Sequence, residues 1–268
     1  MWNYREGAEK RGQHKKGLGS GGWGLGKTTE GPASEWVRRR LGFEPDAIQM
    51  RLLDTPAERV ILNCTRQWGK STVTAAKAVH RALEFPDKLI IAMSPSARQT
   101  GELMRKIEYF LRHCGVRVKG DGSNEMSIVL TNGSRIVGLP GGEGTIRGFS
   151  SVNLLIVDEA ARVPDESYRA ARPMLAVAKG DLLLLSTPYG KRGIFYEEWI
   201  SSSDWLRLQV RGEECPRIPK DFLADERRSL GDLWYRQEYN CEFIDNETQL
   251  FSRDTITCAL DKDIEPLF

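Results

Sequence analysis

Two short segments of this sequence carry residues suited to nucleotide chemistry. Residues 66–71 (RQWGKS) contain Gly-Lys-Ser and follow the apolar run 60–62, and the carboxylate pair Asp158-Glu159 ends the apolar run 154–157. A glycine-containing turn between a buried strand and a helix can surround phosphate with backbone N–H groups, while its lysine adds positive charge. Two carboxylates at the end of a second strand can supply a magnesium ligand and a base. Together these segments predict ATP hydrolysis.

A second segment, residues 21–28 (GGWGLGKT), matches the phosphate-loop pattern G-x-x-x-x-G-K-[ST] in full. The residues before it are polar, basic and glycine-rich, and Pro32 follows where a helix should run. The loop 64–71 has Cys64 in place of the first glycine, but it lies between an apolar run and a helix-forming segment. Because the pattern carries its function only between a strand and a helix, we expect residues 64–71 to be the phosphate loop. The alternative is a chance Gly-Lys-Ser joining a buried strand to a helix.

Apolar runs and turn signals indicate the elements that position these residues. The runs are nearly continuous, as in strands covered on both faces, and helix-forming segments lie between them. This alternation predicts an α/β fold with an open, mostly parallel sheet flanked by helices. Residues 128–130 and 135–137, joined by Asn132-Gly133, predict an antiparallel hairpin added to that sheet. We expect strands at 60–63, 89–93, 154–157, 182–185 and 206–210, and helices at 70–83 and 97–114.

Composition restricts the class of protein. A chain of 268 residues with 40% hydrophobic and 28% charged residues can bury one large core or two small ones. Its formal charge of +2 requires any nucleic-acid surface to be a local patch. Five cysteines without a C-x-x-C pair favour a reducing compartment and argue against a zinc site. No apolar stretch approaches the roughly 18 residues of a membrane span and no signal-peptide core is present, so we expect a soluble cytoplasmic protein that does not enter a membrane.

Three motifs occur in an order that closely resembles the large terminase subunit of tailed bacteriophages and prophages. They are residues 66–71, residues 154–161 (LLIVDEAA) and residues 186–190 (STPYG), and the similarity extends from residues 43–49 to residues 234–243. That family also has Arg-Gln before the glycine of its phosphate loop. The resemblance implies a P-loop NTPase fold of the ASCE, RecA-like type over residues 34–245. Residues 1–33 are rich in Gly and Lys and poor in aliphatic residues, so their composition predicts a disordered basic arm.

The resemblance also implies a function and a set of partners. Large terminases couple ATP hydrolysis to the pumping of double-stranded DNA into a capsid through the portal. We therefore expect ATP and Mg²⁺ as cofactors, and double-stranded DNA, the portal protein and the small terminase subunit as partners. The chain is expected to be monomeric in isolation and to form a homo-oligomeric ring, a pentamer, on the portal. It is expected in the bacterial host cytoplasm and transiently at the portal vertex of the capsid.

Members of this family typically continue into an RNase H-like nuclease domain. Residues 249–254 resemble the bridge into that domain, and the sequence ends at Phe268. A metal-dependent nuclease needs carboxylates that converge from separate strands. The carboxylates at positions 254, 261, 263 and 265 have no predicted strands to hold them. We therefore expect residues 246–268 to be a linker toward an absent nuclease domain, and this chain to have no nuclease activity.

Four side chains are expected to do the chemistry. Lys70 should contact the β- and γ-phosphates, Ser71 should place its hydroxyl on Mg²⁺, and Asp158 should hold the same ion. Glu159, one residue past the strand, should orient or deprotonate the attacking water. An acidic helix start after a buried strand is the alternative for the Asp158-Glu159 pair. The predicted nucleotide-binding set of the loop is Gln67, Trp68, Gly69, Lys70, Ser71 and Thr72.

Further roles follow from the family pattern. Arg66 is expected to reach the γ-phosphate in cis, and Arg147, in a glycine-flanked loop eleven residues before Asp158, to act on a neighbour's nucleotide across the ring. Gln49 resembles the glutamine that reads adenine, since an amide can both donate and accept. The alternatives are an exposed loop arginine at 147 and a surface glutamine at 49.

Other positions carry weaker signals. Phe43 could pack on the adenine ring. Ser186 and Thr187 resemble the motif that senses the γ-phosphate, although a plain turn before proline would have the same sequence. The predicted contacts to DNA phosphates are Arg98, Lys191 and Arg192.

Two other functions share part of this pattern. A helicase-like DNA-dependent ATPase has the same phosphate loop and Asp-Glu strand, but it needs a second RecA-like domain, for which about 200 ordered residues leave no room. An inactive prophage remnant, or an ATP-binding assembly subunit, would not need intact catalytic positions. Every such position is present here. Both alternatives remain open at the level of sequence.

The choice of phosphate loop can be tested with two lysine variants. Lys70→Ala is expected to abolish ATP turnover, because it removes the charge that compensates the phosphates, whereas Lys27→Ala is expected to leave turnover unchanged. Steady-state phosphate release by both variants and the wild type measures the difference. The reverse pattern would show that residues 21–28 form the functional loop.

Overall fold

The structure is a computed structural model that describes residues 31–120, 122, 126–141, 148–245, 255 and 259. The second motif match at residues 21–28, the predicted arm up to residue 30, and Arg147 lie outside these residues. Of the predicted linker 246–268, only residues 255 and 259 are described. The predictions made for these segments therefore stay predictions.

Within the described residues, seven strands form a single sheet in the order β3-β4-β2-β5-β6-β1-β7. Neighbouring strands are parallel except β3 and β4, which form the antiparallel hairpin predicted around Asn132-Gly133. The predicted mixed α/β fold with a mostly parallel sheet is confirmed, and each of the five predicted apolar strands lies within an observed strand. The strands are β1 Arg59–Cys64, β2 Leu89–Ser94, β3 Ser127–Val129, β4 Arg135–Pro140, β5 Leu154–Asp158, β6 Asp181–Ser186 and β7 Leu206–Val210.

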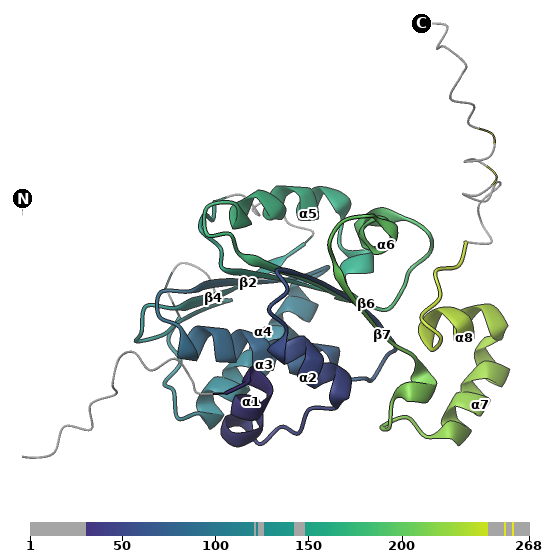
Figure 1. Ribbon diagram of the computed structural model, residues 1–268, viewed down its shortest axis with the longest axis horizontal. Helices are drawn as coiled ribbons and strands as arrows, with labels where there is room; N and C mark the ends of the chain where they lie inside the picture. The colour runs from purple at the N-terminus through teal and green to yellow at the C-terminus, as the bar shows by residue number, and fades with distance from the viewer. Residues whose placement is uncertain are drawn as a thin grey trace, which may run out of the picture.

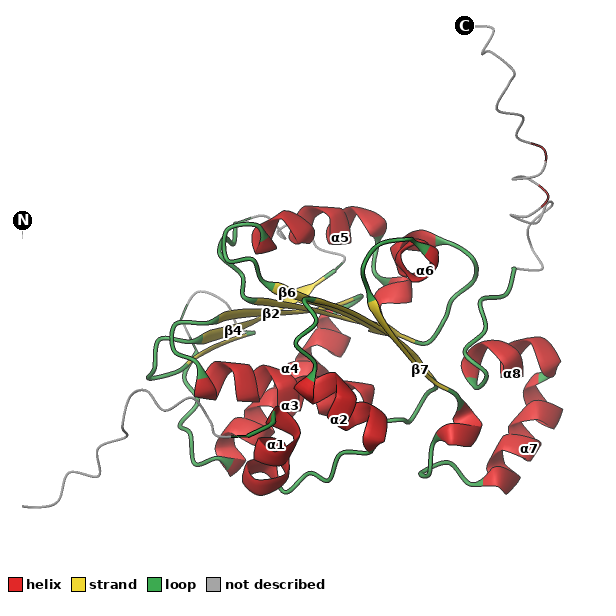
Figure 2. Ribbon diagram, viewed as in Figure 1, coloured by secondary structure: helices red, strands yellow, loops and turns green. Residues whose placement is uncertain are grey.

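Helices cover both faces of this sheet (Figure 1). One face carries α1 Ala33–Leu41, α2 Ala47–Asp54, α3 Lys70–Glu84 and α4 Ala97–His113, and the other carries α5 Asp165–Ala171 and α6 Gly193–Ile200. Two further helices, α7 Lys220–Leu230 and α8 Asp232–Glu238, lie beyond the β7 edge (Figure 2). The predicted helices at 70–83 and 97–114 correspond to α3 and α4 within one residue at each end.

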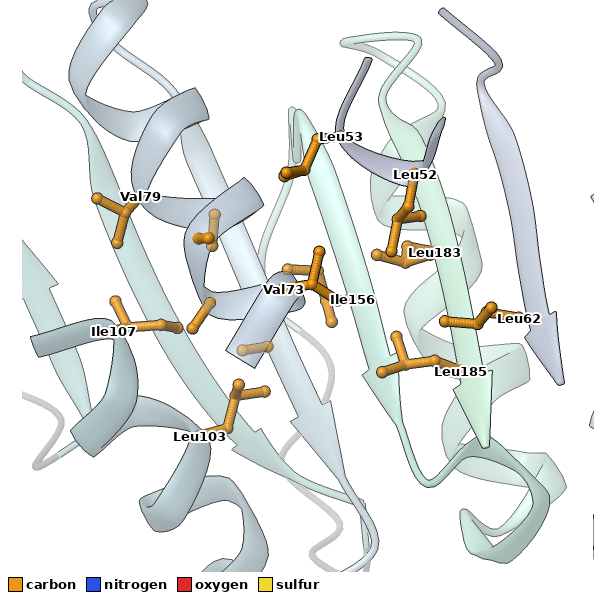
Figure 3. Close-up of a cluster of buried hydrophobic side chains, with 14 of the residues drawn as sticks. Leu52, Leu53, Leu62, Val73, Val79, Leu103, Ile107, Ile156, Leu183 and Leu185 are labelled. Atoms are coloured by element: carbon orange, nitrogen blue, oxygen red, sulfur yellow. The ribbon is translucent and has the colours of Figure 1, made fainter. Parts of the chain in front are cut away.

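The core has two layers because successive side chains of a strand point to opposite faces. Leu183 and Leu185 of β6 lie in the layer beneath α2, α3 and α4, whereas Leu182 and Leu184 lie in the layer beneath α5 and α6. Figure 3 shows the first layer, in which side chains of β1, β5 and β6 gather against those of α2, α3 and α4. Among the described residues, no helix is both long and apolar enough to cross a bilayer.

The order of the strands determines where the site forms. β6 lies between β1 and β5 and is parallel to both, so the carboxyl ends of all three strands reach the same edge of the sheet. In register, Asn63 lies beside Ser186 and Asp158 lies beside Leu185. Chain that follows these ends comes together there, which is where open parallel sheets bind ligands.

A pair of glycine substitutions tests the packing at the opposite end of β6. An alanine Cβ at Gly180 would clash with the Val152 carbonyl oxygen and with the Asn153 backbone, whereas one at Gly101, within α4, would meet open space. Gly180→Ala should therefore lower the free energy of unfolding by about 1–3 kcal/mol. Gly101→Ala should raise it by about 0.5–1 kcal/mol, since alanine is the better helix former. Urea denaturation measures both, and a Gly180→Ala variant as stable as wild type would contradict this close backbone approach.

Candidate active site

The loop that follows β1 has the geometry of a phosphate cradle. Gln67 and Gly69 take left-handed backbone conformations, with φ of 60° and 97°, and Gly69 is the residue before α3 begins. A Cβ on Gly69 would also lie 3.3 Å from Nε2 of Gln49. Trp68 is buried in the core and anchors the loop. The first N–H groups of α3 have no partner within the helix, so this turn presents them to an anion at the end of the loop.

Lys70 is held at the centre of the site. Its side chain is buried, and Nζ donates to the Thr65 carbonyl oxygen at 3.3 Å and to Oγ1 of Thr187 at 3.1 Å. Nζ also lies 3.9 Å from Oε1 of Glu159. The preceding Cys64, which replaces the glycine of the usual pattern, is buried, and burial raises the pKa of its thiol to about 12. That thiol is therefore neutral, and Lys70 is the positive charge facing the carboxylates.

Ser71 and Asp158, which the sequence predicts to be ligands of one magnesium ion, are in contact. Oγ of Ser71 donates to Oδ2 of Asp158 at 3.1 Å, and Oδ1 accepts the Glu159 N–H at 3.0 Å. Burial, followed by the charge of Glu159, raises the pKa of Asp158 to about 6, against the opposing effects of Lys70 and Ser71. A buried carboxylate next to a hydroxyl is an oxygen donor set that suits Mg²⁺. A cation here would offset the cost of burying the negative charge of Asp158, so these residues fit Mg²⁺.

Glu159 follows directly after β5 and is turned out of the strand direction. Its backbone takes the left-handed conformation, with φ of 51°, which is uncommon for a residue other than glycine and is often found at functional positions. Oε2 accepts from NH1 of Arg162 at 3.3 Å, while Oε1 faces Lys70. The side chain is a quarter exposed. A carboxylate placed between the lysine and solvent in this way can act on a water molecule that enters the site.

The end of β6 provides the link between these groups. Oγ1 of Thr187 donates to the Cys64 carbonyl oxygen at 3.1 Å while accepting from Lys70. Oγ of Ser186 donates to the Thr187 carbonyl oxygen at 2.8 Å, and both side chains are buried. The structure therefore brings Thr187 into direct contact with the predicted phosphate-binding lysine. The role of this motif in sensing the γ-phosphate stays a prediction.

Arg66 lies in the loop but contacts a residue far along the chain. Its Nε is 2.6 Å from Oε2 of Glu238, the last residue of α8, and Oε1 of Glu238 is 3.6 Å from NH2 of Arg162. Arg217 reaches the loop from the same part of the chain. Its NH2 donates to the Trp68 carbonyl oxygen at 2.5 Å and to Oδ2 of Asp46 at 3.0 Å.

Sequence reasoning missed Arg162, Arg217 and Glu238. Arg162 follows Glu159 by three residues, and Glu238 lies in the segment 234–243 that carries part of the family resemblance. Both therefore lie in or next to a motif that could have indicated them. Arg217 lies in a loop with no motif of its own. Only the fold places it next to the phosphate loop.

The two residues predicted to contact adenine have different surroundings. Phe43 and Thr72 line one open cavity of about 500 Å³, with residues of α4 on its other side. Gln49 is fully buried, so it is not the surface glutamine of the alternative interpretation. Its Nε2 donates to the Trp68 carbonyl oxygen at 3.2 Å, and its Oε1 accepts the Asp46 N–H at 3.0 Å in a capping box at the start of α2. Gln49 thus connects α2 to the phosphate loop, and reading of adenine stays a prediction.

The three residues predicted to contact DNA have different surroundings. Arg98 is exposed near the start of α4. Lys191 pairs with Asp245 at 3.1 Å, and the guanidinium of Arg192 lies 5.2 Å from the centre of the Tyr189 ring. Their contact with DNA stays a prediction.

Comparisons with known proteins agree with this geometry. The family described as "Terminase large subunit, T4likevirus-type, N-terminal" matches residues 61–258, more than half of the chain. The terminase large subunit of Escherichia phage T5 is 24% identical over 223 residues, covering 78% of this chain and 50% of that protein. The large terminase ATPase domain of Thermus phage P74-26 superposes with a TM-score of 0.70 at 21% identity, covering 80% of this chain and 99% of that one.

A further structure is the large terminase of the thermophilic bacteriophage D6E in complex with ADP. It superposes with a TM-score of 0.59 at 16% identity, over 70% of this chain and 48% of that chain. At these identities the structural matches show a shared fold. The chain spans about half the length of the curated relatives it matches.

The buried Asp158 predicts a pH-dependent effect on stability. Its pKa is about 6 in the folded chain and about 3.9 in the unfolded chain, so its contribution to stability is greatest below pH 4 and is lost as the pH rises through 6. From pH 4.5 to pH 7.5, the free energy of unfolding of Asp158→Asn, relative to that of wild type at the same pH, should therefore rise by about 1–3 kcal/mol.

The measurement is urea denaturation of the nucleotide-free protein at both pH values. Asp221→Asn, at an exposed position in the first turn of α7, is the matched control, and its effect should stay within about 0.5 kcal/mol at both pH values. Equal pH dependence in the two variants would contradict the raised pKa.

Proposed function

Because the chain belongs to the terminase large subunit family and matches its N-terminal part, we propose that it hydrolyses ATP to drive double-stranded DNA into a viral procapsid. One observation carries the proposal. Lys70 and Ser71 begin α3, and Asp158 and Glu159 lie at the end of β5 about ninety residues later, yet the four form one connected group at the sheet edge. A phosphate-binding lysine, an ion-binding pair and a base are the parts that phosphoryl transfer requires.

Each residue in this group has a distinct task in the proposed reaction. The N–H groups at the start of α3 and the ammonium of Lys70 bind and orient the phosphates. Ser71 and Asp158 would hold a magnesium ion, which supplies neutralisation of phosphate charge when it is bound. Glu159 orients the attacking water and takes its proton at a carboxylate oxygen.

Arginines would complete the charge compensation. Arg66 is in the loop itself and, by the family pattern, acts on the γ-phosphate in cis. Arg147 would act on the nucleotide of a neighbouring subunit, so the isolated chain should turn over slowly. Ring formation on the portal, with the small terminase subunit as a further partner and the host cytoplasm as the location, is part of the same proposal.

Translocation requires that hydrolysis be transmitted to other parts of the molecule. Thr187 is suited to this because its hydroxyl contacts both Lys70 and the end of β1. Loss of the γ-phosphate would change the charge around Lys70, and β6 would receive that change through one hydrogen bond. The absence of a nuclease activity in this chain remains a prediction from the sequence.

Replacement of the proposed base tests the function. Glu159→Gln should retain binding of ATP and magnesium but lose at least about 100-fold in turnover, because the amide keeps the shape of the side chain without its basicity. Nucleotide binding is measured by calorimetry and turnover by phosphate release. Glu166→Gln, an exposed position in the first turn of α5, makes the same change of charge and should turn over as wild type does.

Two results would count against the proposal. Full turnover by Glu159→Gln would remove this residue from the role of base. A wild-type chain that binds ATP without turnover, even when assembled into a ring, would favour an ATP-binding assembly subunit.

A further inference from the structure

Lys77 is a buried lysine to which the proposed reaction gives no task. It lies in α3, seven residues after Lys70, and only 8% of the residue is exposed. A buried ammonium is costly unless acceptors lie next to it. The Nζ of Lys77 donates to the carbonyl oxygens of Leu52 at 3.0 Å and of Leu53 at 3.3 Å. Both acceptors belong to the last turn of α2.

Lys77 therefore closes the carboxyl end of α2. The last carbonyl groups of a helix have no partner within the helix, and this end carries partial negative charge, so a cation is favoured there. Asp54, the last residue of α2, accepts from the backbone N–H of Ser34 at 2.7 Å and from its hydroxyl at 2.6 Å. The side chains of Leu52 and Leu53 lie in the core layer that α3 covers (Figure 3). This end of α2 is thus held by main-chain and side-chain contacts.

The amino end of α2 is attached to the phosphate loop. Nε2 of Gln49, in the first turn, donates to the Trp68 carbonyl oxygen. The helix has eight residues and spans about 12 Å, so its two attachments lie close together. α3 begins at the loop with Lys70 and carries Lys77 about two turns further on. α2 is therefore connected to the phosphate loop and its helix at both ends, through Gln49 and through Lys77.

From this geometry we propose that Lys77 is a positioning residue for recognition of the nucleotide base, because it holds α2 so that Gln49 stays beside the phosphate loop. The inference rests on the proposed function, since it assumes that ATP binds at the loop and that Gln49 contacts its adenine. Gln49 can do this while keeping its contacts with Asp46 and Trp68, because its oxygen and its nitrogen can each make a second hydrogen bond.

The proposal separates two parts of nucleotide binding. Without Lys77, the carboxyl end of α2 would be free to move, and Gln49 would lose its fixed position relative to the base. The phosphates would keep their partners, because these come from the loop and from the start of α3. Loss of Lys77 should therefore weaken recognition of the base and leave phosphate binding in place. A general loosening of the fold would weaken both.

Calorimetric titration with Mg·ADP and Mg·CDP tests this role. The two nucleotides share the ribose and the diphosphate, so the ratio of their affinities reports recognition of the base alone. Lys77→Met keeps a long apolar stem but donates no hydrogen bond. Its preference for ADP over CDP should fall about two- to tenfold, the range expected for one or two hydrogen bonds to a base. Its affinity for CDP should equal that of wild type.

Two comparisons identify the cause of the effect. Lys220→Met makes the same change of charge at an exposed position at the start of α7, and its preference should equal that of wild type. In a Gln49→Ala background, Lys77→Met should cause no further fall, since the residue that Lys77 positions is gone.

Titration of Lys77 provides a test that needs no variant. Burial, followed by the charge of Arg81, lowers the pKa of Lys77 to about 8, against the opposing effects of Asp181 and Asp54. The pKa of the neighbouring His80 is lowered to about 4, so this imidazole stays neutral above pH 7. From pH 7 to pH 9 the ammonium loses its charge, and a neutral amine is a weaker partner for the helix end. The wild-type preference for ADP should fall about two- to fivefold over this range.

Lys77→Gln completes the design, because its amide can donate to one of the two carbonyl groups but does not titrate. Its preference for ADP should lie between those of wild type and Lys77→Met and should be the same at pH 7 and pH 9. If Lys77→Met does not fold, Lys77→Gln and the pH dependence of the wild type carry the test.

Four results would overturn the positioning role and leave the proposed function intact. They are an unchanged preference in both Lys77 variants, an equal loss of affinity for ADP and CDP, a fall that persists without Gln49, and a wild-type preference that is the same at pH 7 and pH 9. Failure of the wild type to bind either nucleotide would instead contradict the proposed function, and the inference with it.

Discussion

The burial of opposite charges at one edge of a parallel sheet is the constraint on which this site depends. Lys70 and Asp158 are both buried, and a buried charge is stable only with partners around it. The partners of Lys70 are the residues that directly follow β1, β5 and β6, and those of Asp158 come from α3 and from the end of its own strand. The positions of three strands and one helix are thus coupled to the charge balance. Anything that adds or removes charge here, such as a phosphate or a metal ion, acts on all of them.

Much of the fold follows from local patterns. The apolar runs predicted the buried strands, the small and apolar residues after Lys70 predicted α3, and Asn132-Gly133 predicted the hairpin. The pairing of Ser71 with Asp158 was also predictable, because parallel strands that lead into a phosphate loop and an Asp-Glu pair end at the same edge. These features are encoded within a few residues of each other or follow from strand order.

Other contacts could not be predicted because they join residues with no local relation. Glu238 meets Arg66 across more than 170 positions, and within the described residues no strand follows α7 and α8 to fix their place. Gln49 shows a different limit. Its type suggested adenine recognition, but its two amide atoms are already engaged with Asp46 and Trp68. The residue type of an amide indicates what it can bond to, whereas the fold decides which partner it has.

The segment from β7 to residue 243 contacts the phosphate loop and β1 at several points. Arg217 contacts the Trp68 carbonyl oxygen, Glu238 contacts Arg66 and Thr65, and the Cys241 carbonyl oxygen accepts from Asn63 at 2.8 Å. Two of these contacts involve charged side chains, and they hold residues 66 and 68 of the loop. A change of charge at the loop therefore alters how this segment is held, and by reciprocity a movement of the segment alters the loop. The attachment of α8 and the charge balance at Lys70 are thus linked through Thr65 and Arg66.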